Sequence, residues 1–277
     1  MTFPTPVIQL VGCYESMSEP SPISERIASG SRVLSAVSCA AVRALPLWAA
    51  IVPLLTINIC YLTAISLDHL PACVPYLSGC TSVSSAGRMA PESLIFKLGM
   101  LPSAVIAVLF WWHCSMFLEV GRQSRFRLVV LRVLGVTAAL SLTLYALNLG
   151  LLGDDYRLLR RIGIDGFALS SFTAQVMFVV AYRHMRIGPT KSLWLWLIAL
   201  CMALPILAIA MNVAQWAGVD RHAANNTGAW NAFVLQSAFY AVMYRLWQRH
   251  DFPGQSSNTS LGRPRNRIRT SRRTRTS

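Results

Sequence analysis

Two cysteines are the first residues in this chain whose type and spacing suggest chemistry. Cys73 and Cys80 lie in the longest connection between hydrophobic segments, residues 72–92. A disulfide persists in an oxidising compartment, a condition met if this connection faces the lumen or the cell exterior. A proline and a glycine in the spacer suit a small closed loop, so we predict a bond that holds residues 75–78 against the helix ends. Two unpaired thiols are the alternative, because spacing does not determine geometry.

Pro91 and Glu92 stand where the second hydrophobic segment begins. Proline fits the first helical position, where a backbone N–H has no partner within the helix. A carboxylate in the first turn meets the positive end of the helix dipole. We therefore predict that both residues open a helix. A catalytic acid at Glu92 is the alternative, but the sequence shows no partner for it nearby.

Other residues capable of chemistry are scattered. The chain has no hydrolase elbow, phosphate-binding loop, dinucleotide fingerprint or zinc-type histidine pair, so we predict no catalytic residue, cofactor or metal site. Besides His113 and Arg132, the polar residues inside the hydrophobic segments include Asn58, Asn148, Asp165, Gln175, Asn212, Gln215, Asn231 and Gln236. Asp165 is a functional candidate because it is ionisable, although it can also reach the interface or pair with Arg161.

The composition indicates a membrane protein. Hydrophobic residues make up 54% of the chain and charged residues only 13%, about half of the usual charged share of a soluble domain. Mean hydropathy is +0.48, and the apolar residues are concentrated in long runs. The net charge of +14 lies mainly in short connections and the last residues. Without a folded basic domain, this charge indicates membrane orientation and anionic lipid, and we predict no nucleic-acid binding.

Six apolar segments come close to the length that crosses a bilayer. About 20 residues span ~30 Å of hydrocarbon at 1.5 Å per residue. A spanning segment must satisfy its own backbone, so each is predicted to be a helix and the fold class to be all-α. The segments are Ala41–Leu67, Leu94–Leu118, Leu128–Leu152, Ile162–Tyr182, Leu193–Trp216 and Thr227–Trp247. They form one predicted transmembrane domain over residues 41–252, with an outer loop at 68–93.

Lysine and arginine predict the orientation of these helices. With the N-terminus in the cytosol, the inner connections hold more of these residues than the outer ones. Both termini are therefore predicted to be cytosolic. The connection Gly153–Arg161 is the exception, because it places Arg157, Arg160 and Arg161 on the outer side. Two neighbouring aspartates count little in this rule.

Both ends of the chain are predicted to be cytosolic tails. Residues 1–40 are polar and rich in Ser and Pro, which predicts a flexible tail without a cleavable signal peptide, followed by an uncleaved signal anchor. Residues 253–277 lack apolar periodicity and are predicted to be disordered. Their candidate contacts to anionic lipid are Arg263, Arg265, Arg267, Arg269, Arg272, Arg273 and Arg275. Each is worth roughly 1 kcal/mol near an anionic surface; a solvated tail is the alternative.

Short motifs in the transmembrane domain resemble one family. Pro75-Tyr76-Leu77-Ser78 and a Ser/Gly-rich stretch precede Ala90-Pro91-Glu92 and an apolar helix. Trp230 lies near the start of the last segment, which Arg249-His250-Asp251-Phe252 closes. Together with six spans, this pattern over Ala41–Phe252 resembles the DRAM/FRAG/Sfk family. That family includes damage-regulated autophagy modulators, post-GPI-attachment-to-proteins factors and the CWH-type N-terminal domain.

The resemblance implies a multi-pass protein of an endomembrane (Golgi, ER or lysosome) or of the plasma membrane. It implies a role in GPI-anchor lipid remodelling, lipid organisation or autophagy. Membrane lipids are the implied partners, with GPI or anionic headgroups. The candidate luminal recognition loop comprises Pro75, Tyr76, Leu77, Ser78, Pro91 and Glu92.

Three functions are compatible with these observations. The first is a non-enzymatic factor that organises lipids or matures GPI anchors through the outer loop. The alternatives are a small transporter or channel, and an intramembrane lipid-modifying enzyme. A polar, water-accessible cavity at mid-membrane would favour transport, whereas a carboxylate or histidine cluster at the luminal headgroup level would favour catalysis.

Overall fold

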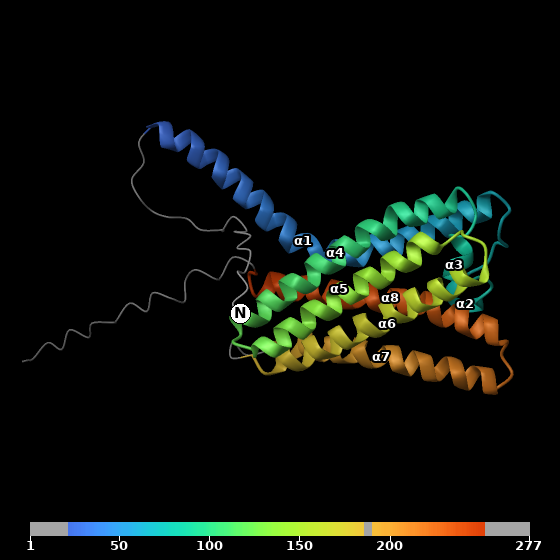
Figure 1. Ribbon diagram of the computed structural model, residues 1–277. Coiled ribbons are helices and arrows are strands. Elements are labelled where there is room, and N and C mark those ends of the chain that lie inside the picture. The colour runs from blue at the N-terminus through green and yellow to red at the C-terminus, as the bar shows by residue number, and fades with distance from the viewer. Residues whose placement is uncertain (1–21, 186–189, 253–277) are drawn as a thin grey trace, which may run out of the picture.

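The computed structural model describes the backbone of residues 22–185 and 190–252, and the side chains of residues 40–185 and 190–252. Over these residues the fold is all-α. The elements are α1 (Pro22–Ser66), α2 (Pro75–Ser78), α3 (Val83–Ala86), α4 (Glu92–Val120), α5 (Arg125–Asn148), α6 (Asp154–Arg183), α7 (Lys191–Trp216) and α8 (Arg221–Arg249). The long helices run side by side in one bundle, with α2 and α3 together at one end (Figure 1). We call this end the outer end, following the predicted orientation.

Five helices of the described chain are long and apolar enough to cross a membrane, which indicates a multi-pass helical membrane protein. They are α4, α5, α6, α7 and the part of α1 from Ala40 to Ser66. The prediction of long apolar helices is thus confirmed for five segments. The sixth segment is also helical, and α8 has 29 residues. It is not among the five because polar side chains such as Asn226, Asn231 and Gln236 lower its hydropathy.

The first helix begins earlier than predicted. α1 starts at Pro22, so residues 22–40, predicted as part of a flexible tail, are helical in the structure. No proline interrupts the chain between Pro22 and Pro46, so the backbone can continue its helical hydrogen bonds. Residues 1–21 lie outside the described part of the chain, as do residues 253–277 with their candidate arginines.

The fourth predicted helix also begins earlier, and this difference shapes the candidate site. α6 starts at Asp154, so most of the predicted connection 153–161 forms helical turns. Asp154 and Asp155 lie in the first turn, where carboxylates are stabilised by the helix dipole. The hydropathy of this stretch is low because it is rich in arginine, which hides the helix from a search for apolar runs. Its arginines therefore have fixed positions on a helix.

Aromatic side chains fill the inner half of the bundle. Phe110 of α4 and Trp247 of α8 stack with ring centroids 5.8 Å apart. Phe252, just beyond α8, packs edge-on against Phe117 of α4 at 5.4 Å. Buried rings contribute large apolar areas, so these contacts join α4 firmly to α8.

The segment that follows α8 is held against two other helices. His250 Nε2 lies 3.1 Å from the hydroxyl of Tyr182 in α6, and Asp251 forms an ion pair with Arg43 of α1. Burial, and to a lesser degree the charge of Arg249, lowers the pKa of His250, so the imidazole is neutral at pH 7. These contacts fix the inner end of α8.

A second apolar cluster lies in the outer half of the bundle. Ile57 of α1, Phe96 of α4 and Trp230 of α8 are fully buried in it. Val83 and Ala86 of the short helix α3 belong to the same cluster. The outer loop is therefore part of the hydrophobic core and packs directly on the helices.

Candidate functional site

Hydrogen bonds from α1 and α8 fix the outer loop to the bundle. The hydroxyl of Tyr76 in α2 accepts from Nδ2 of Asn58 (2.8 Å) and donates to its Oδ1 (3.0 Å). The carbonyl of Tyr76 accepts from Nδ2 of Asn231 (2.8 Å), and the indole of Trp230 donates to the carbonyl of Thr81 (2.9 Å). The polar groups of Tyr76 are thus used within the protein.

The other residues of the predicted recognition loop differ in exposure. Pro75 is buried at the start of α2. Leu77 is 81% exposed, and Ser78 is exposed while its hydroxyl donates to the carbonyl of Val74 (3.0 Å). Within residues 75–78, Leu77 and Ser78 are the side chains available for a contact outside the chain.

A disulfide and a glycine shape the turn around α2. Cys73 and Cys80 are joined, with Cα atoms 6.7 Å apart, inside the usual range. The hydroxyl of Tyr61 in α1 donates to the carbonyl of Cys73 (2.7 Å) and accepts from its N–H (3.0 Å). Gly79 has a φ of 59°, and a Cβ there would overlap the carbonyl oxygen of Ala223 in α8. Glycine is therefore needed where α2 meets α8.

Glu92 has a partner that the sequence did not reveal. It is the first residue of α4, as predicted, whereas Pro91 precedes the helix. Glu92 is 1% exposed, and its Oε1 lies 2.7 Å from Nδ1 of His69. Its Oε2 is buried without a hydrogen-bond partner among the described residues. A buried carboxylate needs such a partner, so the pair fastens the start of α4 to the chain just after α1.

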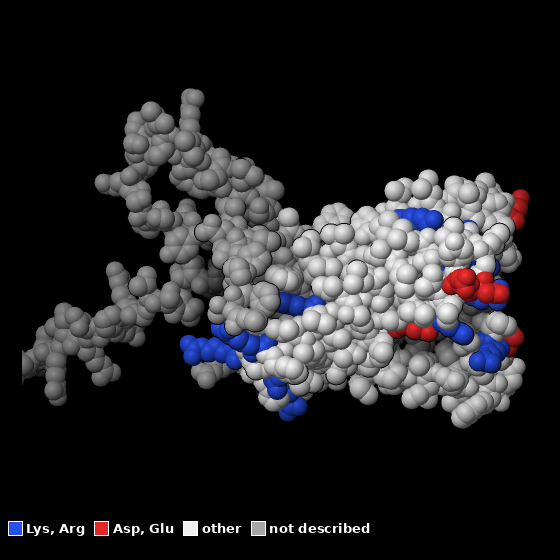
Figure 2. Space-filling view, viewed as in Figure 1, with Lys and Arg blue, Asp and Glu red and all other residues white. Residues whose placement is uncertain are grey.

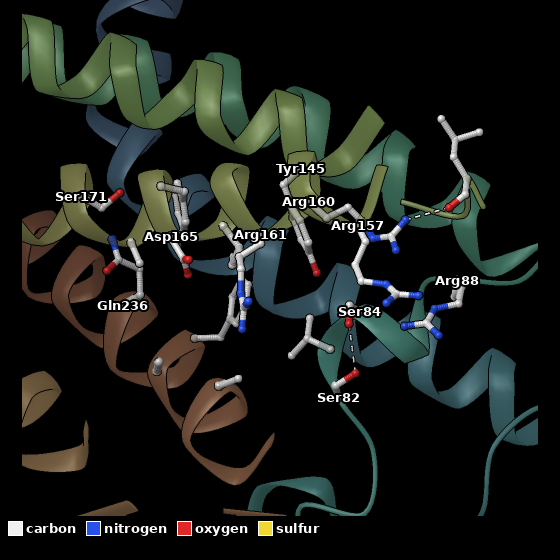
Figure 3. Close-up of a pocket in the computed structure, with 18 of the residues that line it drawn as sticks. Ser82, Ser84, Arg88, Tyr145, Arg157, Arg160, Arg161, Asp165, Ser171 and Gln236 are labelled. Atoms are coloured by element: carbon white, nitrogen blue, oxygen red, sulfur yellow. Dashed lines mark hydrogen bonds between the residues drawn. The ribbon is translucent and has the colours of Figure 1, made fainter. Parts of the chain in front are cut away.

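A cavity of about 670 Å³ lies in the outer half of the bundle, within the usual range for ligand sites. α6 and α8 form facing walls (Figure 3), and α3, Tyr145 of α5 and Leu204 of α7 complete the lining. Ile164, Phe167 and Phe233 contribute large apolar surfaces. Figure 2 shows a hollow on this face of the molecule, with charged side chains beside it. We call this cavity the outer cleft.

Four arginines line the outer part of the cleft, and we call them the arginine cluster. They are Arg88, which follows α3, and Arg157, Arg160 and Arg161 of α6. Arg160 donates to the carbonyls of Asn148 (3.1 Å) and Leu151 (2.8 Å). These bonds hold the guanidinium of Arg160 at the cleft before any ligand binds.

Few carboxylates lie close enough to the arginine cluster to neutralise its positive charge. Within the described residues, no carboxylate oxygen lies within 4.0 Å of Arg88, Arg160 or Arg161. Arg157 lies 3.5 Å from Asp154, but both side chains are highly exposed, and such surface pairs are weak. The outer part of the cleft therefore carries net positive charge.

The deep end of the outer cleft is polar. Ser171 of α6 is 2% exposed, and its hydroxyl has no hydrogen-bond partner in the described part of the chain. Gln236 of α8 accepts from Gln175 (2.6 Å) and donates to Tyr240 (2.9 Å). Asp165 lies between this end and the arginine cluster (Figure 3). The cleft thus has a cationic outer part, apolar walls and a polar deep end.

The sequence points to some of these residues singly but not to the site. Arg157, Arg160 and Arg161 stand out as an exception to the orientation rule, and Asp165 stands out as an isolated ionisable residue. The early start of α6 brings these four together. Gln236 of α8 stands out as a polar residue inside a span, but nothing in the sequence places Arg88 or Gln236 beside α6, because packing between distant segments creates the cleft.

Comparison with known proteins gives no relative. The chain matches no protein-family model, no curated protein and no solved structure. The outer loop and the outer cleft are the features on which a function can rest.

Proposed function

We propose that this protein binds an anionic lipid in the outer cleft, with the headgroup phosphate against the arginine cluster. The observation that carries this proposal is a cavity of about 670 Å³ with apolar walls and four arginines. Guanidinium groups bind phosphate oxygens in a bidentate geometry and keep their charge in apolar surroundings. A ligand that satisfies both parts of the cleft has a phosphate at one end and hydrocarbon at the other, as a phospholipid has.

The position of the arginine cluster supports a role in binding. Outer connections of membrane proteins usually carry few lysines and arginines. Here α6 presents Arg157, Arg160 and Arg161 at the end of the bundle assigned to the outer side. Charge repulsion within the cluster is relieved when a phosphate binds. A bound headgroup would thus account for arginines that orientation does not explain.

We also propose that the protein handles or organises lipid without a chemical reaction, in line with its resemblance to DRAM/FRAG/Sfk proteins. Residues that carry this resemblance make contacts that hold the fold, namely Tyr76 and Trp230 at the outer end and His250 and Asp251 at the inner end. The proposed setting is an endomembrane or the plasma membrane. The proposed processes are GPI-anchor maturation, lipid organisation and autophagy, since each involves lipids with phosphate headgroups.

An intramembrane lipid-modifying enzyme is the second candidate, and one pair of residues favours it. A histidine oriented by a carboxylate is a common general base, and His69 and Glu92 form such a pair at the outer end. The pair does not line the outer cleft. An enzyme that used this pair would therefore have to bind its substrate outside the outer cleft, although the outer cleft is the cavity that best fits a lipid.

Lipid titration tests the binding proposal. Replacing Arg157 and Arg161 together with glutamine should weaken binding of phosphatidylglycerol to the full chain at least about tenfold. A hydrogen bond to a charged group contributes roughly 1.5–3 kcal/mol, and about 1.4 kcal/mol corresponds to a tenfold change in affinity. Native mass spectrometry of the detergent-solubilised protein measures the affinity. Arg122 and Arg125, both exposed at the inner end, give the matched control when replaced with glutamine. Equal binding by both double variants would contradict the proposal.

We further propose six spans, with both termini in the cytosol and the outer loop on the opposite side. Five apolar helices support five spans, and α8 runs alongside them over a similar length (Figure 1). Tags at each terminus should be cleaved when protease is added to the cytosolic side of sealed vesicles. A tag in the loop near Ser84 should be protected. Protection of the C-terminal tag would contradict this arrangement. It would mean that α8 does not bring the C-terminus back to the cytosolic side.

A further inference from the structure

Three charged side chains form one row along the α6 wall of the outer cleft. Arg157, Arg161 and Asp165 are four positions apart, so they follow one another along the same helix face. All three line the cavity, and Figure 3 shows Asp165 on the deep side of the arginines. From the outer end inward, the row reads positive, positive, negative.

Asp165 forms no ion pair with the described residues of the protein. Within the described residues, no lysine, arginine or histidine nitrogen lies within 4.0 Å of its carboxylate, although Arg161 is one turn away. A carboxylate inside a span is costly unless it meets a cation or water. Lining a cavity within the apolar part of α6, Asp165 is placed to bind a cationic group.

A second unsatisfied group lies further in. The hydroxyl of Ser171, on the same helix, is 2% exposed, lines the cavity and has no hydrogen-bond partner among the described residues. Buried hydroxyls are normally hydrogen-bonded. The deep part of the outer cleft is therefore polar beyond Asp165.

We infer that the lipid in the outer cleft is a phospholipid with a primary amine in its headgroup. Its phosphate lies against Arg157 and Arg161, and its ammonium lies against Asp165. This inference rests on the proposed function and names the ligand class. In phosphatidylethanolamine a two-carbon spacer separates phosphate from ammonium, which suits charges about one helical turn (~5.4 Å) apart.

Other headgroups complement this row less well. A glycerol headgroup carries no positive charge to pair with Asp165. A headgroup with a second phosphate would place that phosphate beside Asp165, whose carboxylate would repel it. The quaternary ammonium of choline has a charge but no N–H, so it forfeits the charge-assisted hydrogen bond to Asp165. The cleft should therefore distinguish an amine from both glycerol and choline.

Headgroup preference of the full chain in detergent tests the inference. Unaltered protein should bind phosphatidylethanolamine about tenfold more tightly than phosphatidylcholine of the same chains, because only the primary ammonium can donate a charge-assisted hydrogen bond to Asp165. Asp165→Asn should remove this preference and leave affinity for phosphatidylglycerol unchanged or higher. Asp155→Asn is the matched control, since Asp155 lies on the same helix outside the cavity. It should behave as the unaltered protein.

The outcomes separate this inference from the proposed function. If phosphatidylglycerol binds in a manner that depends on Arg157 and Arg161, but phosphatidylethanolamine has no advantage over phosphatidylcholine, the inference is overturned and the proposed function stands. An amine preference that survives Asp165→Asn also overturns the placement of the ammonium. If no phospholipid binds, both fail. The headgroup comparison uses unaltered protein, so it does not depend on the folding of any variant.

Discussion

Replacing Trp230 with alanine is expected to lower the free energy of unfolding by about 3–5 kcal/mol, the usual cost of removing a buried large aromatic side chain. Trp230 is 0% exposed. Its ring packs edge-on against Tyr61 at 5.7 Å and Tyr76 at 5.1 Å. Its indole N–H donates to the carbonyl of Thr81, which is 149 positions away in the chain. The substitution therefore removes both an aromatic contact and a hydrogen bond between α8 and the outer loop.

Two further substitutions serve as references for the loss of stability caused by Trp230→Ala. Trp216→Ala is the control, because Trp216 is 88% exposed and such surface changes usually stay within about 0.5 kcal/mol. Trp230→Phe keeps most of the buried ring but leaves the Thr81 carbonyl unpaired, so its loss should lie between the two. Denaturant unfolding in detergent, followed by circular dichroism, measures all three variants. Equal midpoints for Trp230→Ala and Trp216→Ala would show that this contact does not hold the loop.

The same substitution links loop packing to the outer cleft. α3 begins two residues after Thr81, and this part of the loop supplies Ser82, Val83 and Ser84 to the cavity wall. When the loop loosens, this wall is no longer fixed opposite α6. Trp230→Ala should therefore also weaken lipid binding, at temperatures where the protein is still folded.

The helices could be predicted because a membrane-spanning segment has to meet simple requirements of composition and length. A segment that crosses hydrocarbon must be apolar for about 20 residues and must satisfy its own backbone. α7 is apolar along nearly its whole length, and its predicted and observed ends nearly coincide. α6 is not apolar throughout, because its first turns carry Arg157, Arg160 and Arg161. Hydropathy reports where lipid surrounds a helix, and a helix can continue beyond that region.

The outer loop shows a different limit of the sequence. Pro75-Tyr76-Leu77-Ser78 resembles a family motif, and the motif suggested a recognition surface. The structure shows that Tyr76 bonds to α1 and α8, which no local pattern reveals. Asn231, whose Nδ2 donates to the Tyr76 carbonyl, lies 155 positions away. Contacts of this kind depend on how helices pack, and that packing also creates the outer cleft.

Removing the imidazole of His69 is expected to destabilise the protein by about 3–5 kcal/mol at pH 7, the usual cost of leaving a buried charge without its partner. Glu92 is 1% exposed. Its Oε1 lies 2.7 Å from Nδ1 of His69, and its Oε2 already lacks a partner among the described residues. His69→Ala therefore leaves a carboxylate at the start of α4 with both oxygens unpaired.

Neutralising the carboxylate separates this effect from a simple loss of packing. Glu92→Gln in the His69→Ala background removes the buried charge, so the double variant should regain part of the lost stability. His222→Ala is the matched control, since His222 is exposed on α8, and it should change stability by no more than about 0.5 kcal/mol. Denaturant unfolding of these variants in one detergent gives the comparison. If the losses from His69→Ala and Glu92→Gln simply add, the two side chains act independently, and contacts other than this pair hold the start of α4.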